Sequence, residues 1–183
     1  MFVQTEQTPN PNTLKFLPGK KVSEVGPFEF TDAKQSENKL IKDLLSINEV
    51  NMVFLGSDFI TVKKTEKVLW EKIKPGIISL INEYYLNGNE SVLKKNSIKQ
   101  NSKIEEPKDQ VVKKIIDVLD SKIRPAVARD GGDIKFQSFE NGIVKVELQG
   151  SCSGCPSSIM TLKQGVQNLL CHYVPEVQKV EAV

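Results

Sequence analysis

Two cysteines separated by two residues carry the clearest chemistry in this sequence. Cys152 and Cys155 stand in the stretch "GSCSGCPSS", residues 150–158, among small side chains. Such a pair supplies two thiolates, which is enough for a dithiol–disulfide redox centre. A structural zinc site or an iron–sulfur cluster usually takes four protein ligands, so for a metal the pair is half a site. The spacing alone leaves both chemistries open.

The elements around this pair are expected to place it between a strand and a helix. The run "DIKFQSFENGIVKVELQG" predicts a β-hairpin that turns at Asn141 and Gly142. Residues 156–173 then show apolar side chains at helical spacing, and Pro156 is a favoured first helical residue. Cys155 is therefore expected to cap the helix, where the helix dipole lowers a thiol pKa. The small neighbours are expected to leave both sulfurs exposed.

The other candidate ligands of the same half of the chain lie at the far end of this helix. Cys171 and His172 are about 16 residues along it, which is roughly 24 Å from Cys155 at 1.5 Å per residue. That distance excludes both from a site within one chain, and we expect them to be structural. A second copy related by a two-fold axis would supply the missing Cys₂. The expected assembly is therefore a homodimer joined through the metal.

Three functions stay open at this point: a cluster carrier, a thiol–disulfide oxidoreductase, and a structural zinc site between subunits. Thioredoxin-like pairs belong to a βαβ framework with parallel strands. Here the pair follows the second strand of an antiparallel hairpin, which argues against that fold. Asp130 and Asp133 flank two glycines just before the hairpin. Turn and cap chemistry explains them, with a role near the cysteines as the alternative.

The whole chain is expected to be an α+β protein of two small domains. Residues 87–109 are polar and free of aromatics, so we place a linker at 88–107 between domains at 1–87 and 108–183. The second domain has the predicted order α-β-β-α-β, with its first helix kinked at Pro125. The first is expected to hold a strand within 12–18, a helix from Ser36, a hairpin within 49–64, and a helix over 67–86 interrupted at Pro75 and Gly76.

Composition excludes several classes of function. The net charge is +2 and both halves are nearly neutral, unlike the basic footprint of a nucleic-acid-binding protein. No apolar run approaches the roughly 18 residues of a membrane span. No secretory or transit segment is recognised at the start of the sequence. Three cysteines, an odd number, fit a reducing intracellular compartment better than a disulfide framework.

Several of these stretches resemble a known family. "DGGDIKF" and "VELQGSCSGCPSSIMTLKQGVQNLLCHYVPEV" resemble the C-terminal domain of the NifU/Nfu family of iron–sulfur cluster scaffold and carrier proteins. "TPNPNTLKFLPG", the hairpin "LGSDFITV" and Trp70 resemble the separate N-terminal Nfu domain. The resemblance covers nearly the whole chain outside the linker, with the two domains in the same order.

The resemblance implies a [4Fe–4S] cluster bridged between two subunits, with Cys152 and Cys155 as the ligands from each chain. [2Fe–2S] remains the alternative cluster type. It also implies delivery of the cluster to apo client proteins, and contact with upstream assembly proteins, rather than enzymatic turnover. Cys171 falls where the family pattern has no ligand. A bacterial cytoplasm is the expected location, and the mitochondrial matrix is the alternative that the family allows.

Overall fold

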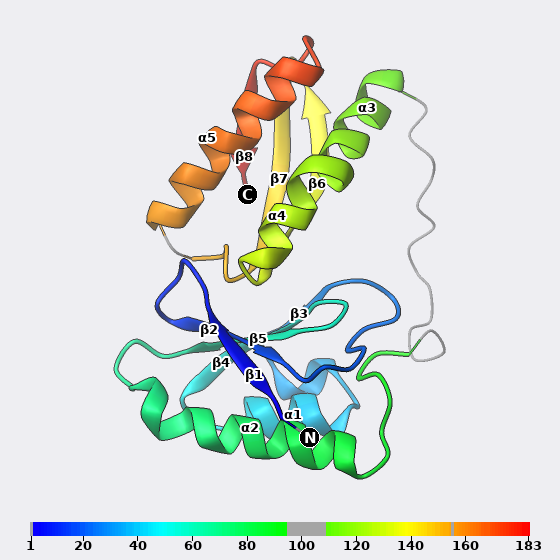
Figure 1. The fold of residues 1–183 in the computed structure, drawn as a ribbon. Coiled ribbons are helices and arrows are strands. Elements are labelled where there is room, and N and C mark those ends of the chain that lie inside the picture. The colour runs from blue at the N-terminus through cyan, green and yellow to red at the C-terminus, as the bar shows by residue number, and fades with distance from the viewer. Residues whose placement is uncertain (1, 95–108, 155) are drawn as a thin grey trace. The chain divides into compact units, whose positions relative to one another are not determined.

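The computed structural model describes residues 2–94, 109–154 and 156–183, and the side chains of residues 156–158 are not described. The chain forms two compact units, one within residues 1–99 and one within residues 100–183 (Figure 1). Each unit combines helices with a β-sheet of its own, which confirms the expected α+β fold of two small domains.

The N-terminal unit is built on a five-stranded antiparallel sheet with the order β1-β2-β5-β4-β3. The expected strand is β2 (Thr13–Leu17), and the expected hairpin is β4 (Val50–Leu55) with β5 (Ile60–Lys64). The sequence analysis did not find β1 (Gln4–Gln7) or β3 (Phe28–Phe30). Both are short edge strands: β1 is polar throughout, and β3 has only three residues, fewer than the roughly four to eight of a recognisable strand signal.

Two helices cover one face of this sheet, α1 (Lys39–Leu45) and α2 (Trp70–Leu86), with a short 3₁₀ turn η1 (Ala33–Gln35) before them (Figure 1). The expected start of α1 at Ser36 is wrong. Asn38 caps the helix instead, because its side chain accepts the Leu40 N–H at 2.9 Å.

Pro75 and Gly76 do not divide α2, which runs through them as one 17-residue element, and the kink expected there stays a prediction. Proline lacks the N–H of one helical hydrogen bond. The apolar stripe on either side of it compensates: Ile73, Ile77 and Ile81 are all buried in the core. Fully burying one such side chain stabilises the fold by about 1.5–3 kcal/mol.

The N-terminal unit continues past the expected boundary at residue 87. Val92 and Leu93 are buried, and the Val92 N–H donates to the Val22 carbonyl at 2.8 Å. The Asn38 side chain also donates to the Val92 carbonyl at 2.9 Å. The unit therefore extends at least to Leu93, and the expected linker from residue 95 on lies outside the described residues.

The C-terminal unit has the expected order α-β-β-α-β (Figure 1). Its elements are α3 (Gln110–Val118), η3 (Leu119–Ile123), α4 (Arg124–Arg129), β6 (Gly132–Glu140), β7 (Ile143–Gly150), α5 (Pro156–Tyr173) and β8 (Lys179–Ala182). The expected first helix is divided by η3, a π-helical segment. Pro125 lacks the N–H that would bond to the Ser121 carbonyl, which explains why the regular helical pattern is lost just before it.

The sheet of this unit has the order β6-β7-β8. β6 and β7 form the expected hairpin, whose turn residues Asn141 and Gly142 both have positive φ, 52° and 78°, as a type I′ turn requires. β8 pairs parallel to β7, and α5 makes the crossover between them. β7, α5 and β8 are therefore a βαβ unit, which the sequence analysis did not foresee.

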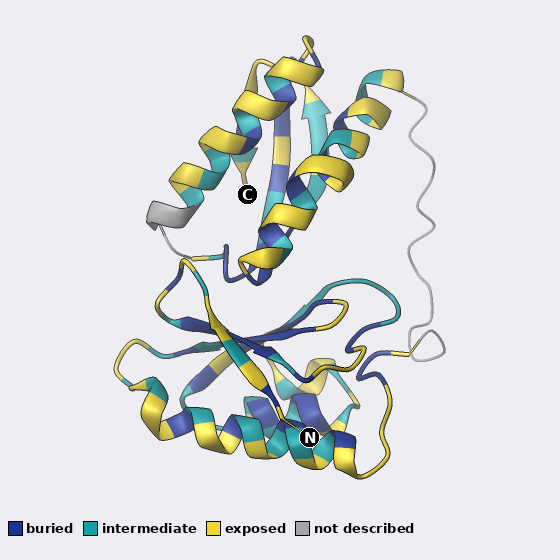
Figure 2. Cartoon of the chain, viewed as in Figure 1, coloured by how far each residue is buried: buried dark blue, intermediate teal, exposed yellow. Residues whose placement is uncertain are grey.

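Helices α3, η3, α4 and α5 cover one face of the three-stranded sheet and turn their buried stripes toward it (Figure 2). The apolar face expected for the first helix is confirmed in part: Ile115, Leu119, Ile123 and Val127 are buried. Val112 and Ile116, expected on the same face, are only half-buried. The four buried residues pack with strand residues such as Ile134 and with Val166 and Leu170 of α5. Within the described parts of both units, no helix is long and apolar enough to cross a membrane.

Candidate metal centre

The cysteine loop connects the end of β7 to the start of α5. Gly150 and Gly154 have φ of 68° and 76°, values that favour glycine, so both positions let the chain turn sharply around Cys152. α5 begins at Pro156, as its sequence predicts. Cys155 lies outside the described residues, so its position as helix cap and its role as a ligand stay predictions.

Cys152 is buried, with 6% of its surface exposed, so the expectation that both sulfurs are exposed is wrong for this residue. The sulfur packs into the core of the C-terminal unit beside Gly132, the first residue of β6. A Cβ at Gly132 would lie 2.8 Å from Cys152 Sγ and 2.6 Å from the Gln149 carbonyl oxygen. The missing side chain of Gly132 therefore makes the space that the sulfur fills.

Two kinds of hydrogen bond hold the loop. Ser151 ties it to the turn between α4 and β6, because its hydroxyl donates to the Asp130 carbonyl and its N–H donates to the Gly131 carbonyl at 3.2 Å. The Ser153 hydroxyl and N–H both donate to the Gly150 carbonyl within the loop, at 2.9 and 3.2 Å. Ser151 therefore fixes the loop to the α4–β6 turn.

Burial raises the pKa of the Cys152 thiol to about 11. The Asp130 and Asp133 carboxylates act in the same direction, and the Ser151 hydroxyl, 3.8 Å from the sulfur, acts against it. Cys152 is therefore a neutral thiol at pH 7. Because metals bind thiolate, ligation by Cys152 must release this proton.

Asp133 is held in a buried ion pair that the sequence analysis missed. It is 4% exposed, and both of its oxygens accept bonds from Arg124, Oδ1 from Nε at 2.8 Å and Oδ2 from Nη2 at 2.9 Å. Arg124 also donates to Asp120 at 3.0 Å, one helical turn before it. These bonds raise the pKa of Arg124 and keep it charged. Asp130 is the C-cap of α4, as cap chemistry predicts.

Cys171 and His172 lie in the last turn of α5, as expected. Cys171 is 15 residues after Pro156, so the helix carries it about 22 Å from the start of α5. The His172 ring packs edge-on against Tyr173 with the ring centroids 4.9 Å apart. Within residues 2–94, 109–154 and 156–183, no three His, Cys, Asp or Glu side chains gather where they could hold a metal ion.

One argument against the redox interpretation fails in the structure, and the structure supplies a different argument against it. The antiparallel-hairpin argument against it fails, because β7 also pairs with β8 in a parallel βαβ unit. However, reactive thiols are partly exposed and have a lowered pKa. Cys152 is buried and its pKa is raised, so it is poorly suited to attack a disulfide.

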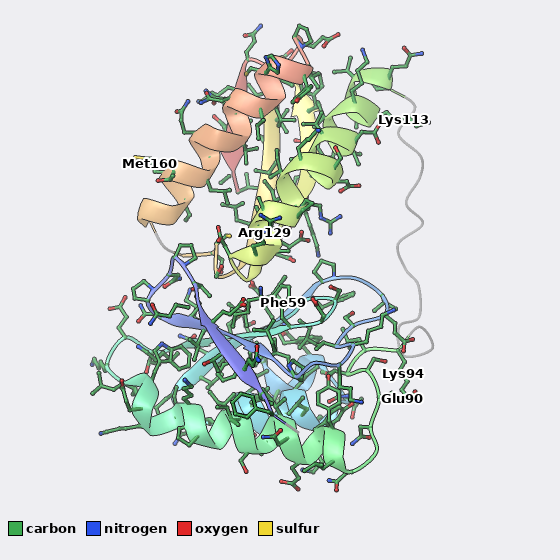
Figure 3. The ribbon with its side chains drawn as sticks, in the orientation of Figure 1. Phe59, Glu90, Lys94, Lys113, Arg129 and Met160 are labelled. Atoms are coloured by element: carbon green, nitrogen blue, oxygen red, sulfur yellow. The ribbon has the colours of Figure 1, made fainter. Side chains whose placement is uncertain are left out.

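One large apolar side chain stands out on α5 near this loop. Met160 lies in the second turn of the helix, is 76% exposed, and points away from the body of its unit (Figure 3). An isolated exposed apolar residue is common on protein surfaces, so Met160 by itself does not define a binding site.

Fold and site together define a two-unit α+β protein with a CxxC loop at a strand–helix junction. The family model described as the NifU-like domain matches residues 115–181, and the model described as the N-terminal domain of the scaffold protein Nfu/NifU matches residues 3–88. The chain belongs to the Nfu family of NifU-like proteins.

The relatives extend the match to the whole chain. It is 46% identical over 185 residues to the human "NFU1 iron-sulfur cluster scaffold homolog, mitochondrial", covering 100% of this chain and 72% of that protein. The protein of the same name from Drosophila persimilis is also 46% identical, and this chain spans 65% of its length. "NifU-like protein 4, mitochondrial" of Arabidopsis thaliana is 45% identical, and this chain again spans 65% of it.

A solution NMR structure of a NifU-like protein from Saccharomyces cerevisiae aligns with 52% of this chain and 86% of its own, at 29% identity and a TM-score of 0.46. The names of the human, fly and plant relatives place those proteins in mitochondria. They do not support the bacterial cytoplasm that the sequence analysis preferred.

Proposed function

We propose that this chain carries an iron–sulfur cluster, held by Cys152 and Cys155, and delivers it to apo client proteins. The observation that carries the proposal is the ligand set at the β7–α5 loop. The sequence places two cysteines there, and α5 holds Cys171 and His172 far from them. A loop with two thiols and, in the part of the chain that the structure describes, no third ligand nearby fits cargo that is shared and passed on.

The count of ligands supports a dimer. A [4Fe–4S] cluster usually takes four cysteine thiolates, and one chain offers two at this loop. Two chains related by a two-fold axis would each contribute Cys152 and Cys155. The cluster would then lie between the subunits, and the homodimer would depend on it.

The chemistry at Cys152 is an exchange of a proton for a metal. The neutral thiol gives its proton to solvent, and the sulfur becomes a thiolate ligand of iron. Delivery would reverse the ligation when client thiolates replace those of the carrier. No substrate is chemically converted, so the proposed role is that of a carrier and not of an enzyme.

The names of the relatives support the finer points of place and partners. Several are called mitochondrial iron–sulfur cluster scaffold homologues, so we place this chain in the mitochondrial matrix. Its partners would be upstream assembly proteins that supply the cluster and apo proteins that accept it. The N-terminal unit carries no cysteine or histidine, and its role would be in interaction or positioning.

Anaerobic reconstitution of the full chain with iron and sulfide tests this proposal. We expect a brown dimer that contains about four irons and four sulfides per pair of chains, measured by absorption, metal analysis and native mass. Cys152→Ser and Cys155→Ser should each lose the colour and the dimer. Cys171→Ser is the matched control and should keep both.

Two other outcomes would overturn the proposal. A colourless monomer that reduces insulin disulfides would identify a thiol–disulfide oxidoreductase. One zinc ion per dimer, with no uptake of iron, would identify a structural zinc site between subunits.

A further inference from the structure

The helices that cover the C-terminal sheet differ in the charge of their outward sides. Exposed charged residues line the outward side of α3, η3 and α4: Lys113, Lys114, Asp117, Asp120, Lys122 and Arg129. α5 lies in the same layer and has 18 residues, of which Lys163 is the only Asp, Glu, Lys or Arg. A helix that faces solvent ordinarily carries charged residues on its outward side, so α5 departs from this pattern.

The outward side of α5 is one continuous surface, here called the α5 face (Figure 2). It consists of exposed residues at helical spacing: Thr161, Gln164, Gly165, Asn168, Leu169 and His172. Lys163 lies outside this face, because helical spacing puts it beside Gln167, whose side chain accepts the Val180 N–H of β8 at 3.0 Å. The α5 face is therefore made of residues that are neither carboxylates, lysines nor arginines.

Such a face fits a second copy of itself. In a dimer with two-fold symmetry, residues near the axis meet the same residues of the partner, so a charge there would meet a like charge. The centre of an interface is also poorer in charged residues than the rest of a protein surface. Leu169, 38% exposed, offers apolar contact, and Gly165 has nothing within 4 Å of its missing Cβ. Two helices can therefore approach each other closely at Gly165.

The relative direction of the two helices follows from the proposed function, on which this inference rests. The cysteine loop leads directly into the N-terminal end of α5. This helix has 18 residues and is about 27 Å long. An antiparallel pair would put the two cysteine loops at opposite ends of the pair, too far apart to share one cluster. A parallel pair, with the two-fold axis along the helices, puts both loops at the same end.

We infer that the α5 face is the surface through which two copies of this chain dock, with their α5 helices parallel. Docking brings together the two half-sites that a shared cluster needs. Because the α5 face is largely polar, it contributes little affinity by itself, and the bonds to the cluster supply the rest. The dimer therefore depends on the cluster, while the α5 face fixes how the two chains meet.

A charge introduced at Gly165 tests this docking in the reconstituted full chain. The space beside Gly165 is open, and most residues favour a helix more than glycine does, so α5 should keep its fold. Gly165→Glu and Gly165→Lys should each weaken the dimer about three- to thirtyfold, because like charges then meet at the axis. An equimolar mixture of the two variants should restore the dimer, because opposite charges meet. Sedimentation at several chain concentrations, without oxygen, measures both effects.

Gly76→Glu is the matched control. Gly76 is also an exposed helical glycine with nothing within 4 Å of its missing Cβ, but it lies in α2 of the N-terminal unit. This variant should dimerise within about twofold of the unchanged chain. The loss in the Gly165 variants should also shrink in about 0.5 M salt, because salt screens the repulsion, whereas a loss caused by misfolding would not.

Two results of this experiment would overturn the inference. One is an unchanged dimer in both Gly165 variants. The other is an unchanged dimer that passes its cluster to an apo-ferredoxin more slowly, since the α5 face would then bind client proteins instead of a second copy.

Disulfide trapping in the cluster-free full chain tests the direction of the helices without iron. All three native cysteines are replaced by serine, and Thr161→Cys or Leu169→Cys is oxidised with copper phenanthroline. Parallel helices bring each position to its own copy and raise the effective concentration of the two thiols. Each variant should therefore link to itself at least about tenfold faster than Gly76→Cys in the same background.

The pattern of links decides between the two directions. Antiparallel helices that cross at Gly165 would link Thr161→Cys to Leu169→Cys in a mixture of the two variants. That pattern, or self-linking no faster than in Gly76→Cys, overturns the inference. A wild-type chain that takes up no iron would contradict the proposed function, and the trapping result would still decide how the α5 helices meet.

Discussion

The two units of this chain have similar sizes and layers but different connections, and the chemistry follows the connections. The N-terminal unit joins five antiparallel strands and contains no cysteine. The C-terminal unit contains all three cysteines and has the one parallel pair of neighbouring strands among its described elements, β7 and β8.

The crossover explains why the site lies where it does. A parallel connection through α5 sets the end of strand β7 beside the start of a helix, and the loop between them carries Cys152. The unpaired N–H groups and the dipole of a helix N-terminus favour negative groups such as thiolates. The N-terminal unit also has a strand-to-helix connection, from β5 to α2, but residues 65–69 between them contain no cysteine. The comparison suggests that the first unit can be weakened without loss of the site, whereas small changes near β6 affect the site directly.

The largest expected effect is a loss of stability that is confined to the N-terminal unit. Phe16 is fully buried in the N-terminal core, so Phe16→Ala should destabilise that unit by about 3–5 kcal/mol. Trp70 is the only tryptophan and its ring lies 6.4 Å from that of Phe16, so its fluorescence during urea unfolding reports on this unit alone. Iron bound per chain after reconstitution should not change. A parallel loss of iron would contradict the independence of the units.

An intermediate effect is expected at alkaline pH, and it differs between the units. The folded state raises the pKa of Cys152 from about 8.5 in unfolded chains to about 11. Its contribution is complete below pH ~8.5 and is lost as the pH rises toward 11, by about 3 kcal/mol in total.

Burial also raises the pKa of Tyr85 in the N-terminal unit, whose unfolded value is near 10, so that unit should lose stability only at higher pH. Urea unfolding followed by circular dichroism at several pH values checks the order. In Cys152→Ala the decline that begins near pH ~8.5 should vanish; its persistence would mean that another group causes it.

The smallest expected effects come from a pair of glycines in the C-terminal unit. Gly132→Ala places a Cβ against the Gln149 carbonyl and Cys152 Sγ, and should cost about 1–3 kcal/mol through overpacking. Gly165 lies on the exposed side of α5 with nothing near its missing Cβ, so Gly165→Ala should stabilise the unit by roughly 0.5–1 kcal/mol. Thermal unfolding of the cluster-free chain measures both. Equal effects at the two positions would contradict the close packing at Gly132.

Strongly periodic elements with clear ends were predictable. α5 begins at Pro156 and ends at Tyr173 as expected, and the β6–β7 hairpin turns at Asn141 and Gly142. Their signals are local: a proline at the first helical position, an apolar stripe, and an Asn-Gly turn between alternating strands. The sequence analysis missed β1 because it is polar throughout, and β3 because its three residues, although Phe30 is buried, are too few to show a period.

The partners of the cysteine loop were not predictable in the same way. Arg124 belongs to no quoted motif. Gly132 and Ser151 stand in the quoted stretches "DGGDIKF" and "GSCSGCPSS", but the motifs do not show their contacts, which are with residues distant in the sequence. The sequence analysis singled out Asp130 and Asp133 but did not predict their partners. The Asp133 carboxylate pairs with Arg124, and the Asp130 carbonyl accepts a hydrogen bond from the Ser151 hydroxyl. Spacing rules describe neighbours along the chain, and these contacts join separate elements.

By itself, the sequence determined the elements of the C-terminal unit, the two thiols at a strand–helix junction, and the length of helix that keeps Cys171 away from them. Periodicity and helical rise are properties of the local chain, so they can be read from it directly. Only the tertiary structure decided that Cys152 is buried and neutral. Burial and pKa depend on what other segments bring against the sulfur, here the bare backbone of Gly132 and the turn that holds Ser151.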